Sequence, residues 1–284
     1  MIPAWVDLRE YPFESREFVA DGGTLRYVDE GAGPPVVMVH GTPTWSFMYR
    51  HLIVALRDRF RCVAPDNLGF GLSDRPRGVS YRPQDQARRL GALIDALGLK
   101  DLTLVVHDFG GPIGLAHALD RAEGVRALVL FNTWMWSFEG ERRFELFGRA
   151  LSSPVGRLLY ERFAFSVNVL FRHAVADRSR YTRAVHAHYL KALSGHATGA
   201  YAREVIGSSA WYDGLWRRRE RLARIPALLI WGMKDPAFGA CLGRWRGVFE
   251  RVEVVELPDV GHAPAEERGP ESAAMIARFL EERR

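Results

Sequence analysis

The chain has 284 residues, of which 48% are hydrophobic and 26% are charged, as in an ordinary globular protein. This composition excludes a disordered or low-complexity chain, and the length predicts one or two domains with a full hydrophobic core. The net charge of +5 arises from 39 basic and 34 acidic residues that are largely interleaved, which favours a solvated surface over a nucleic-acid interface.

Targeting and metal-binding signals are not found. Residues 1–10 show no basic segment followed by an apolar stretch, so we expect no signal peptide. No window approaches the roughly 18 uninterrupted apolar residues of a membrane helix. The two cysteines, Cys62 and Cys241, make no disulfide framework, and no Cys/His cluster suggests zinc. We therefore expect a cytoplasmic protein that binds neither membrane nor nucleic acid, and its oligomeric state stays open.

Strand and helix patterns alternate along the first part of the chain. Residues 35–40 form a short, continuous apolar run, typical of a strand covered on both faces. Residues 83–97 are amphipathic with helical spacing. Such alternation predicts a mostly parallel sheet with helices on both faces. The expected strands are 24–29, 35–40, 61–65, 102–107 and 125–131, and the expected helices are 47–56, 83–97 and 110–119.

The pattern changes after Asn132. No strand pattern occurs from residue 134 to about residue 221, a segment rich in aromatic residues and arginine. Helical spacing fits most of it, with breaks at 154–156 and 194–195. The segment is therefore interpreted as a helical insertion into an α/β core.

Strand patterns return at residues 227–231 and 252–257, and a closing helix is expected over 271–282. The sequence thus predicts a core domain built from two separate segments of the chain, with a helical cap inserted between them. The predicted boundaries are 1–133 and 219–284 for the core and 134–218 for the cap.

Residues 104–111 carry the most informative pattern. A buried strand runs directly into a helix, as in a nucleophile elbow, and Asp108 occupies the bend where esterases carry serine. The amide N–H groups of the following helix are expected to keep this carboxylate ionised. Gly110 and Gly111 allow the close backbone approach that a sharp bend needs. Taken alone, Asp108 is better explained as a helix N-cap, which is a very common role for aspartate.

Two further residues make the catalytic interpretation stronger. Asp235 follows the strand at 227–231, and His262 follows the strand at 252–257. Ligands of open α/β sheets bind beyond the carboxyl ends of the strands. The chain order of nucleophile, acid and histidine matches that of α/β-hydrolases. We predict that Asp108, Asp235 and His262 form a catalytic triad.

The loop after residue 39 supplies an oxyanion site. The backbone N–H of Thr42 is expected to pair with that of Phe109 as two hydrogen-bond donors. Pro43 restricts this loop, and tight turns of this kind allow a cis peptide bond before proline.

Several motifs together resemble one family. They are residues 40–47 (HGTPTWSF), 65–74 (PDNLGFGLSD), 107–111 (HDFGG), 131–134 (FNTW), 232–235 (GMKD) and 261–262 (GH). Over about residues 20–282 the chain resembles the haloalkane dehalogenase group of α/β-hydrolases, which borders the epoxide hydrolases. The resemblance implies an α/β-hydrolase fold, with a mostly parallel eight-stranded sheet flanked by helices and an inserted helical cap.

The resemblance also implies a two-step reaction without metal or organic cofactor. Asp108 displaces the leaving group from a saturated carbon of a small apolar substrate, forming an alkyl ester. His262, oriented by Asp235, then activates the water that hydrolyses the ester.

The chain departs from this family at the leaving-group site. Dehalogenases of the family hold the halide between two side-chain N–H donors, commonly a Trp after the nucleophile and an Asn after the His-Gly pair. Here these positions are Phe109 and Thr42. Loss of a hydrogen bond to a charged group costs about 1.5–3 kcal/mol. A halide would still have backbone N–H groups, and the candidates for an indole donor in the pocket are Trp45, Trp134 and Trp136, although core packing or anchoring of the cap is the favoured interpretation of any single Trp.

Other functions remain open at this level. Epoxide hydrolysis would need a proton donor, and the candidate tyrosines are Tyr160, Tyr181, Tyr189, Tyr201 and Tyr212. A β-lactone is a third possible substrate, because some relatives with Asn-Thr-Trp after the sixth strand act on β-lactones. A ligand receptor on a hydrolase scaffold is the non-enzymatic alternative. Asn132, where some relatives carry the catalytic acid, is interpreted as a local hydrogen-bonding residue.

Overall fold

A computed structural model describes residues 2–283, and within them eight strands form one sheet in the order β1-β2-β4-β3-β5-β6-β7-β8. The β1–β2 and β2–β4 pairs are antiparallel, and all other neighbours are parallel. This confirms the mostly parallel sheet expected from the sequence. The strands are β1 (Arg16–Ala20), β2 (Gly23–Glu30), β3 (Pro35–Val39), β4 (Arg61–Pro65), β5 (Leu102–Asp108), β6 (Val125–Thr133), β7 (Ala227–Gly232) and β8 (Val252–Leu257).

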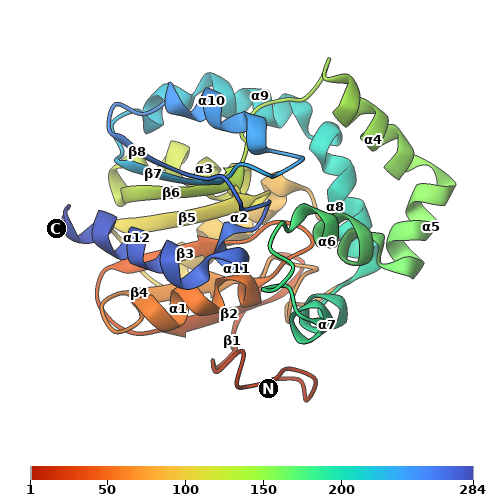
Figure 1. Cartoon of the computed structure of the whole chain (residues 1–284), viewed down its shortest axis with the longest axis horizontal. Coiled ribbons are helices and arrows are strands. Elements are labelled where there is room, and N and C mark those ends of the chain that lie inside the picture. Colours follow the sequence, from red (N-terminus) through yellow and green to blue (C-terminus); the bar gives the residue numbers. More distant parts are fainter. Residues whose placement is uncertain (1, 284) are drawn as a thin grey trace.

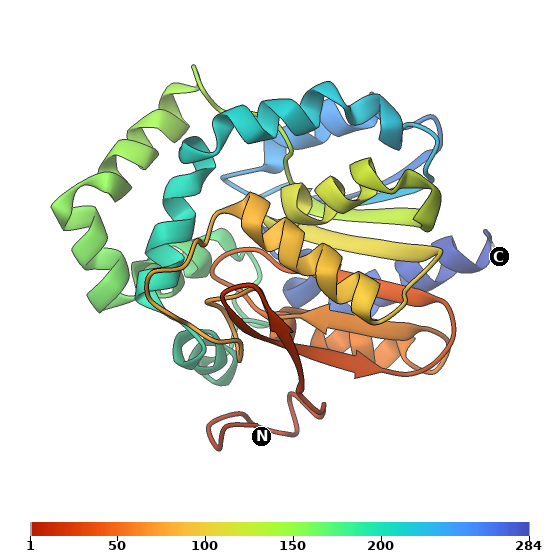
Figure 2. The ribbon, with the colours of Figure 1, turned by 180° about the vertical axis from the view of Figure 1, so that it is seen from behind.

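Strand β3 shows why helices cover both faces of the sheet. Successive side chains of a strand point to opposite faces. Val36 and Met38 pack into the core formed with α1 and α12, whereas Val37 and Val39 pack into the core formed with α2 and α3. Figures 1 and 2 show these two helix pairs on opposite sides of the sheet. The helices of the two faces are α1 (Arg50–Leu56), α2 (Pro83–Ala96), α3 (Gly110–Asp120), α10 (Leu242–Arg246), α11 (Pro264–Glu267) and α12 (Gly269–Glu281).

The segment between β6 and β7 is helical, and its helices α4 to α8 gather beyond one end of the sheet (Figure 1). The breaks expected at 154–156 and 194–195 are helix starts, because Ser153 and Ser194 cap the N-termini of α5 and α8 with their hydroxyls. The division of the chain into core and cap domains stays a prediction. The helices are α4 (Arg142–Ser152), α5 (Pro154–Phe163), a π-helix (Ser166–Phe171), α6 (Arg172–Ala174), α7 (Arg183–Lys191), α8 (Gly195–Gly207) and α9 (Ser209–Arg217).

Two features of the fold were not anticipated. Strand β1 lies at the edge of the sheet and is largely exposed, so it has no continuous apolar run to reveal it. The second feature is the end of α5 at Ala164, which adopts a left-handed conformation (φ +49°) before the π-helix begins. No helix among the described residues is long and apolar enough to cross a membrane.

Candidate active site

Asp108 lies at a sharp bend between β5 and α3. It is the last residue of β5, and α3 begins two residues later at Gly110. Its φ of +52° is rare for a residue other than glycine, and such strained conformations cluster at functional sites. A Cβ on Gly110 would lie 2.0 Å from the carbonyl oxygen of Val39, so only glycine fits there. The strand-to-helix geometry of a nucleophile elbow is therefore present.

The carboxylate of Asp108 is enclosed and receives backbone hydrogen bonds. Its Oδ1 accepts the N–H of Thr42 at 2.7 Å, and the N–H of Phe109 also interacts with it. Burial raises the pKa of Asp108 to about 6, against the opposing effects of the His262 charge and these two N–H groups. At neutral pH the carboxylate therefore remains mostly ionised, as expected from the sequence. The N–H groups of the helix N-terminus alone would lower the pKa of Asp108, but the effect of burial is larger, so the pKa is raised. The Thr42–Pro43 peptide bond is cis.

His262 lies between two carboxylates. Its Nδ1–H donates to Oδ2 of Asp235 at 2.9 Å, and its Nε2 lies 3.6 Å from Oδ2 of Asp108. All three side chains are buried, although they come from the ends of β5 and β7 and from the loop after β8. Burial lowers the pKa of His262, but the charge and hydrogen bond of Asp235 and the charge of Asp108 raise it to about 9.

Two hydrogen-bond donors besides His262 hold the carboxylate of Asp235. One of them is the side chain of Asn132, which the sequence analysis interpreted as bonding only to nearby residues. Asn132 donates through Nδ2 to Oδ2 of Asp235 at 2.9 Å and to the carbonyl of Gly232. Its Oδ1 accepts the Gly232 N–H. The other oxygen of Asp235, Oδ1, accepts the N–H of Ala237 at 2.8 Å. Each carboxylate oxygen therefore has a fixed donor in addition to His262.

The imidazole of His107 supports the backbone of His262. Nε2–H of His107 donates to the His262 carbonyl at 2.7 Å, and the two ring centroids are 4.5 Å apart. Burial lowers the pKa of His107 to about 3, so this ring stays neutral. Sequence reasoning read His107 only as part of the elbow motif, because nothing in the sequence shows that it reaches the loop after β8.

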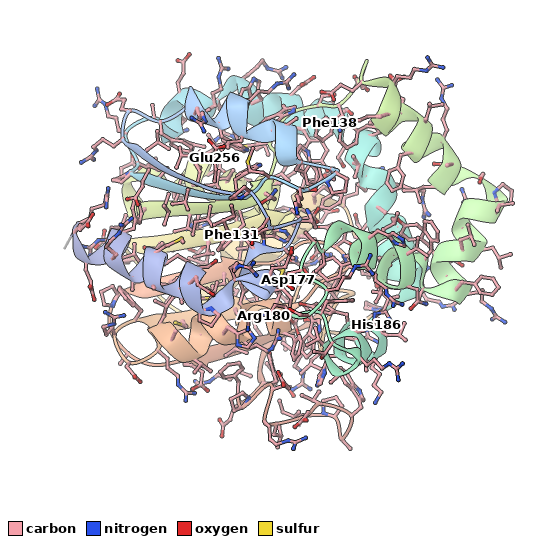
Figure 3. The ribbon with its side chains drawn as sticks, viewed as in Figure 1. Phe131, Phe138, Asp177, Arg180, His186 and Glu256 are labelled. Carbon is pink, nitrogen blue, oxygen red and sulfur yellow. The ribbon has the colours of Figure 1, made fainter. Side chains whose placement is uncertain are left out.

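Glu267 links the His262 loop to the helical insertion. Its buried carboxylate accepts the N–H of Gly261 on one side and the N–H groups of Ala176 and Asp177 on the other, at 2.8–3.1 Å. The N–H of His262 itself donates to the carbonyl of Ala174. Figure 3 labels Asp177 at this junction, where Arg268 forms an ion pair with it at 2.6 Å. No sequence pattern identifies this residue, since Glu-Glu-Arg is typical of an exposed helix end.

A cavity of about 310 Å³ opens onto Asp108 and His262. Its walls are mainly apolar and come from the elbow, the insertion and the loop after β7, as suits a small apolar ligand. Thr42 and Phe109, the predicted leaving-group residues, both line it. The other lining residues are Pro43, Arg143, Phe144, Phe147, Tyr160, Ser166, Leu170, Phe171, Ala174, Ala202, Val205, Pro236, Ala237 and Phe238.

The three tryptophans expected at the pocket are not among its lining residues. Trp45 packs against Tyr11 and Phe47, and Trp136 packs against Trp216 and Trp245. Trp134 lies behind the wall, with its ring 4.9 Å from that of Phe109. All three are buried as core residues, which is the alternative favoured for each of them from the sequence, and none supplies an indole to the cavity wall.

Of the five candidate tyrosines, Tyr160 lines the cavity. The side chains of Tyr189 and Tyr212 instead donate to Glu266 and to the carbonyl of Glu204, and Tyr181 contacts His186. Tyr201 packs against Phe109 without lining the cavity. Burial raises the pKa of Tyr160, and the nearby charge of Asp108 raises it further. Its hydroxyl therefore keeps its proton and can act as a donor.

The fold agrees with the comparisons to known proteins. The profile described as alpha/beta hydrolase fold matches residues 34–268. The chain belongs to the α/β-hydrolase family of enzymes, which confirms the fold and enzyme class expected from the motifs.

Within this family the chain is a homologue of haloalkane dehalogenases. It is 42% identical to haloalkane dehalogenase 2 of Mycobacterium tuberculosis over 282 residues, 96% of this chain and 97% of that protein. It is 31% identical to cis-3-alkyl-4-alkyloxetan-2-one decarboxylase of Shewanella oneidensis over 286 residues, 95% and 89% of the two chains. An epoxide hydrolase of Bacillus megaterium superposes with a TM-score of 0.80 at 25% identity, covering 94% of this chain and all of that one.

Proposed function

We propose that the protein hydrolyses small apolar electrophiles through an ester on Asp108, with haloalkanes as the first candidate substrates. In the first step Oδ of Asp108 attacks a saturated carbon, and the carbon–halogen bond breaks with its electron pair leaving on the halide. The mainly apolar lining leaves few groups that can hold water next to the carboxylate, which favours this displacement. The similarity to haloalkane dehalogenase 2 supports this choice of substrate.

The second step needs His262 as a neutral base. Esterification removes the charge of Asp108, one of the charges that raise the pKa of His262, so the imidazole becomes easier to deprotonate once the ester has formed. It then takes a proton from water, which attacks the ester carbonyl carbon. The N–H groups of Thr42 and Phe109, which face the Asp108 carboxylate, suit the oxyanion of the tetrahedral intermediate. Collapse of that intermediate releases the alcohol and restores the carboxylate.

The observation that carries this proposal is that Asp108 and His262 line a mainly apolar cavity while Asp235 holds His262 from behind. The separations of 2.9 Å from His262 to Asp235 and 3.6 Å from His262 to Asp108 place a base within reach of a water near the ester. The cavity volume of about 310 Å³ limits the substrate to a small molecule.

A second candidate is an electrophile whose leaving oxygen remains attached, such as an epoxide or a β-lactone. Among the described lining residues no indole or amide side chain is available for a halide, because Phe109 and Thr42 hold the usual positions and the tryptophans lie outside. Tyr160 offers a hydroxyl donor instead. The relatives named as an oxetanone decarboxylase and an epoxide hydrolase support this alternative.

Replacement of Tyr160 by phenylalanine separates the two candidates. We expect Y160F to lower the rate of epoxide opening by about 10²-fold, because the alkoxide loses its proton donor. Haloalkane conversion is expected to change less than threefold, since a halide needs no proton. The measurement is initial rates on a bromoalkane and an epoxide of equal chain length. The analogous Y181F variant, whose hydroxyl contacts His186 instead, serves as the control.

The proposed function is tested by trapping the ester. H262A lacks the base, so an adduct on Asp108 should accumulate to one per chain and appear in the intact mass. Bromoalkanes should add an alkyl group without bromine, whereas epoxides and β-lactones should add their whole mass. Peptide mapping should find the adduct on Asp108. If neither the bromoalkanes, the epoxides nor the β-lactones label H262A, the ester mechanism is rejected. The ligand-receptor alternative then becomes the preferred function.

A further inference from the structure

One charged residue of the cavity wall has no part in the ester mechanism. Among the described lining residues, only Asp108, His262 and Arg143 can carry a charge at neutral pH. Asp108 and His262 are buried, whereas the side chain of Arg143 is 51% exposed. Because Arg143 lines the cavity and is also half exposed, it lies where the cavity meets solvent. A guanidinium at that place faces the end of a bound substrate that is remote from the buried nucleophile.

The guanidinium of Arg143 is held against the cavity wall. Its Cζ lies 4.5 Å from the ring centroid of Phe144, which is buried. Nη1 and Nη2 donate to the carbonyl oxygens of Pro236 and Ala237, at 3.5 Å and 3.2 Å. Phe144, Pro236 and Ala237 all line the cavity as well. The charge is therefore fixed at the opening instead of extending freely into solvent.

Arg143 has no close carboxylate partner among the described residues. Its ion pair with Glu141 has a separation of 4.0 Å between Nε and Oε2, and the other oxygen of Glu141 lies 3.9 Å from Arg244. The hydrogen bonds of Arg143 to the two carbonyl groups are long. A guanidinium presents its N–H donors in a planar fork, so most of this capacity remains for a ligand.

The chemistry of this fork narrows the ligand. Two parallel N–H groups of a guanidinium match the two oxygens of a carboxylate, and such bonds are stronger than those between neutral groups. A purely apolar molecule gains nothing from them. The rest of the wall is mainly apolar and suits a short alkyl chain. A molecule with an apolar chain and a carboxylate at one end fits both parts of the cavity.

We propose that Arg143 binds a carboxylate at the remote end of the substrate, so that the preferred haloalkanes are short chains with the halogen at one end and a carboxylate at the other. The proposal rests on the proposed function and narrows its first candidate. Oδ of Asp108 bonds to the carbon that carries the halogen, and the carbon–halogen bond breaks with its electron pair leaving on the halide. The carboxylate takes no part in the reaction, and hydrolysis of the ester releases a hydroxy acid.

The test uses two substrates of nearly the same shape, ω-bromohexanoate and ω-bromohexanamide, of which only the first is charged. R143Q removes the guanidinium. R142Q is the matched control, because Arg142 precedes Arg143 in α4 and is exposed but does not line the cavity. It removes the same charge from the same turn of the helix. The kcat/KM values are measured for both substrates at low and high salt, and thermal unfolding establishes that the variants are folded.

We expect the wild type to prefer the carboxylate, and R143Q to lose about 5- to 10-fold in kcat/KM for it, mainly through KM, as for a charge pair that solvent partly screens. The amide should change less than about twofold, and R142Q should match the wild type on both substrates. R143K, which keeps the charge without the fork, should fall between. The preference for the carboxylate should shrink at high salt.

Three results would overturn the carboxylate site. An equal loss of R143Q on both substrates would mean that Arg143 only holds the loop after β7. Equal effects of R142Q and R143Q would reduce the preference to the general charge of α4. A wild type that prefers the amide would exclude the site directly.

Binding without chemistry separates this inference from the proposed function. Hexanoate and hexanamide carry no leaving group, so their Kd values, measured by calorimetry, do not depend on the ester. Adducts on H262A together with equal hexanoate binding by wild type and R143Q would reject the carboxylate site and keep the ester mechanism. Weaker binding of hexanoate alone by R143Q, with no adduct on H262A, would reject the ester mechanism and keep the carboxylate site.

Discussion

Replacement of Asp108 by asparagine is expected to lower turnover by about 10⁴-fold or more, because an amide oxygen is a poor nucleophile towards a saturated carbon. The change also disturbs the site sterically very little, since the two side chains have nearly the same shape. If the amide nitrogen faced the N–H of Thr42, two donors would meet, so the amide oxygen is expected to take the place of Oδ1. The measurement is initial rates on every substrate that the wild type converts.

The double variant D108N/H262A supplies the decisive comparison, because it should show no adduct under conditions that label H262A completely. Asp66 offers a matched control, since its buried carboxylate also accepts two backbone N–H groups, from Ser46 and Leu72, yet does not line the cavity. The D66N variant should alter stability while leaving the ability to form the adduct. Full labelling of the double variant at another residue would show that Asp108 is not the nucleophile.

The D235N variant is expected to slow ester hydrolysis by about 10³-fold or more, as in triads that lose the carboxylate behind the histidine. An asparagine side chain has a single acceptor oxygen. It can satisfy either Nδ1–H of His262 or the N–H of Ala237, whereas the carboxylate satisfies both. The imidazole therefore loses both its orientation and the anion that stabilises its protonated form.

The pH dependence of the same variant has a definite sign. Asp235 raises the pKa of His262, so D235N lowers that pKa, and the hydrolysis rate should reach its reduced plateau at lower pH than in wild type. The charged His262 in turn lowers the pKa of Asp108, which burial raises to about 6. In wild type the alkylation rate should therefore fall as pH drops below about 6. Single-turnover kinetics resolves the two steps, and identical profiles for both enzymes would contradict the assignment of Asp235.

Many of the core strands and the three triad candidates could be predicted because short stretches of sequence identify them. Strand β5 is buried along its whole length, so it reads as a continuous apolar run, and Asp108 stands where that run meets two glycines. Asp235 and His262 follow strands in the same way. The expected parallel sheet then places all three at one edge.

The remaining parts of the site depend on contacts between distant segments. His107, Asn132 and Glu267 act through partners that are 91–155 residues away along the chain, and no periodicity reveals such pairing. The tryptophans show the same limit. Their places near motifs made them pocket candidates, whereas core packing was the favoured alternative for each, and Trp45 and Trp134 lie in the core, where large aromatic side chains bury much apolar area.

The Glu267 carboxylate has a consequence for altering the substrate range of the enzyme. The carboxylate accepts the N–H groups of residues 176–177 and of Gly261 at the same time. One acceptor therefore fixes both the segment of the insertion at residues 176–177 and the loop that carries His262. Exchange of the whole insertion for that of a relative must therefore reproduce two correctly placed amides, or the base is displaced together with the cap. Grafts confined to α4 and α5 leave this anchor untouched, which makes these two helices the part of the wall that can be redesigned independently of the hydrolytic step.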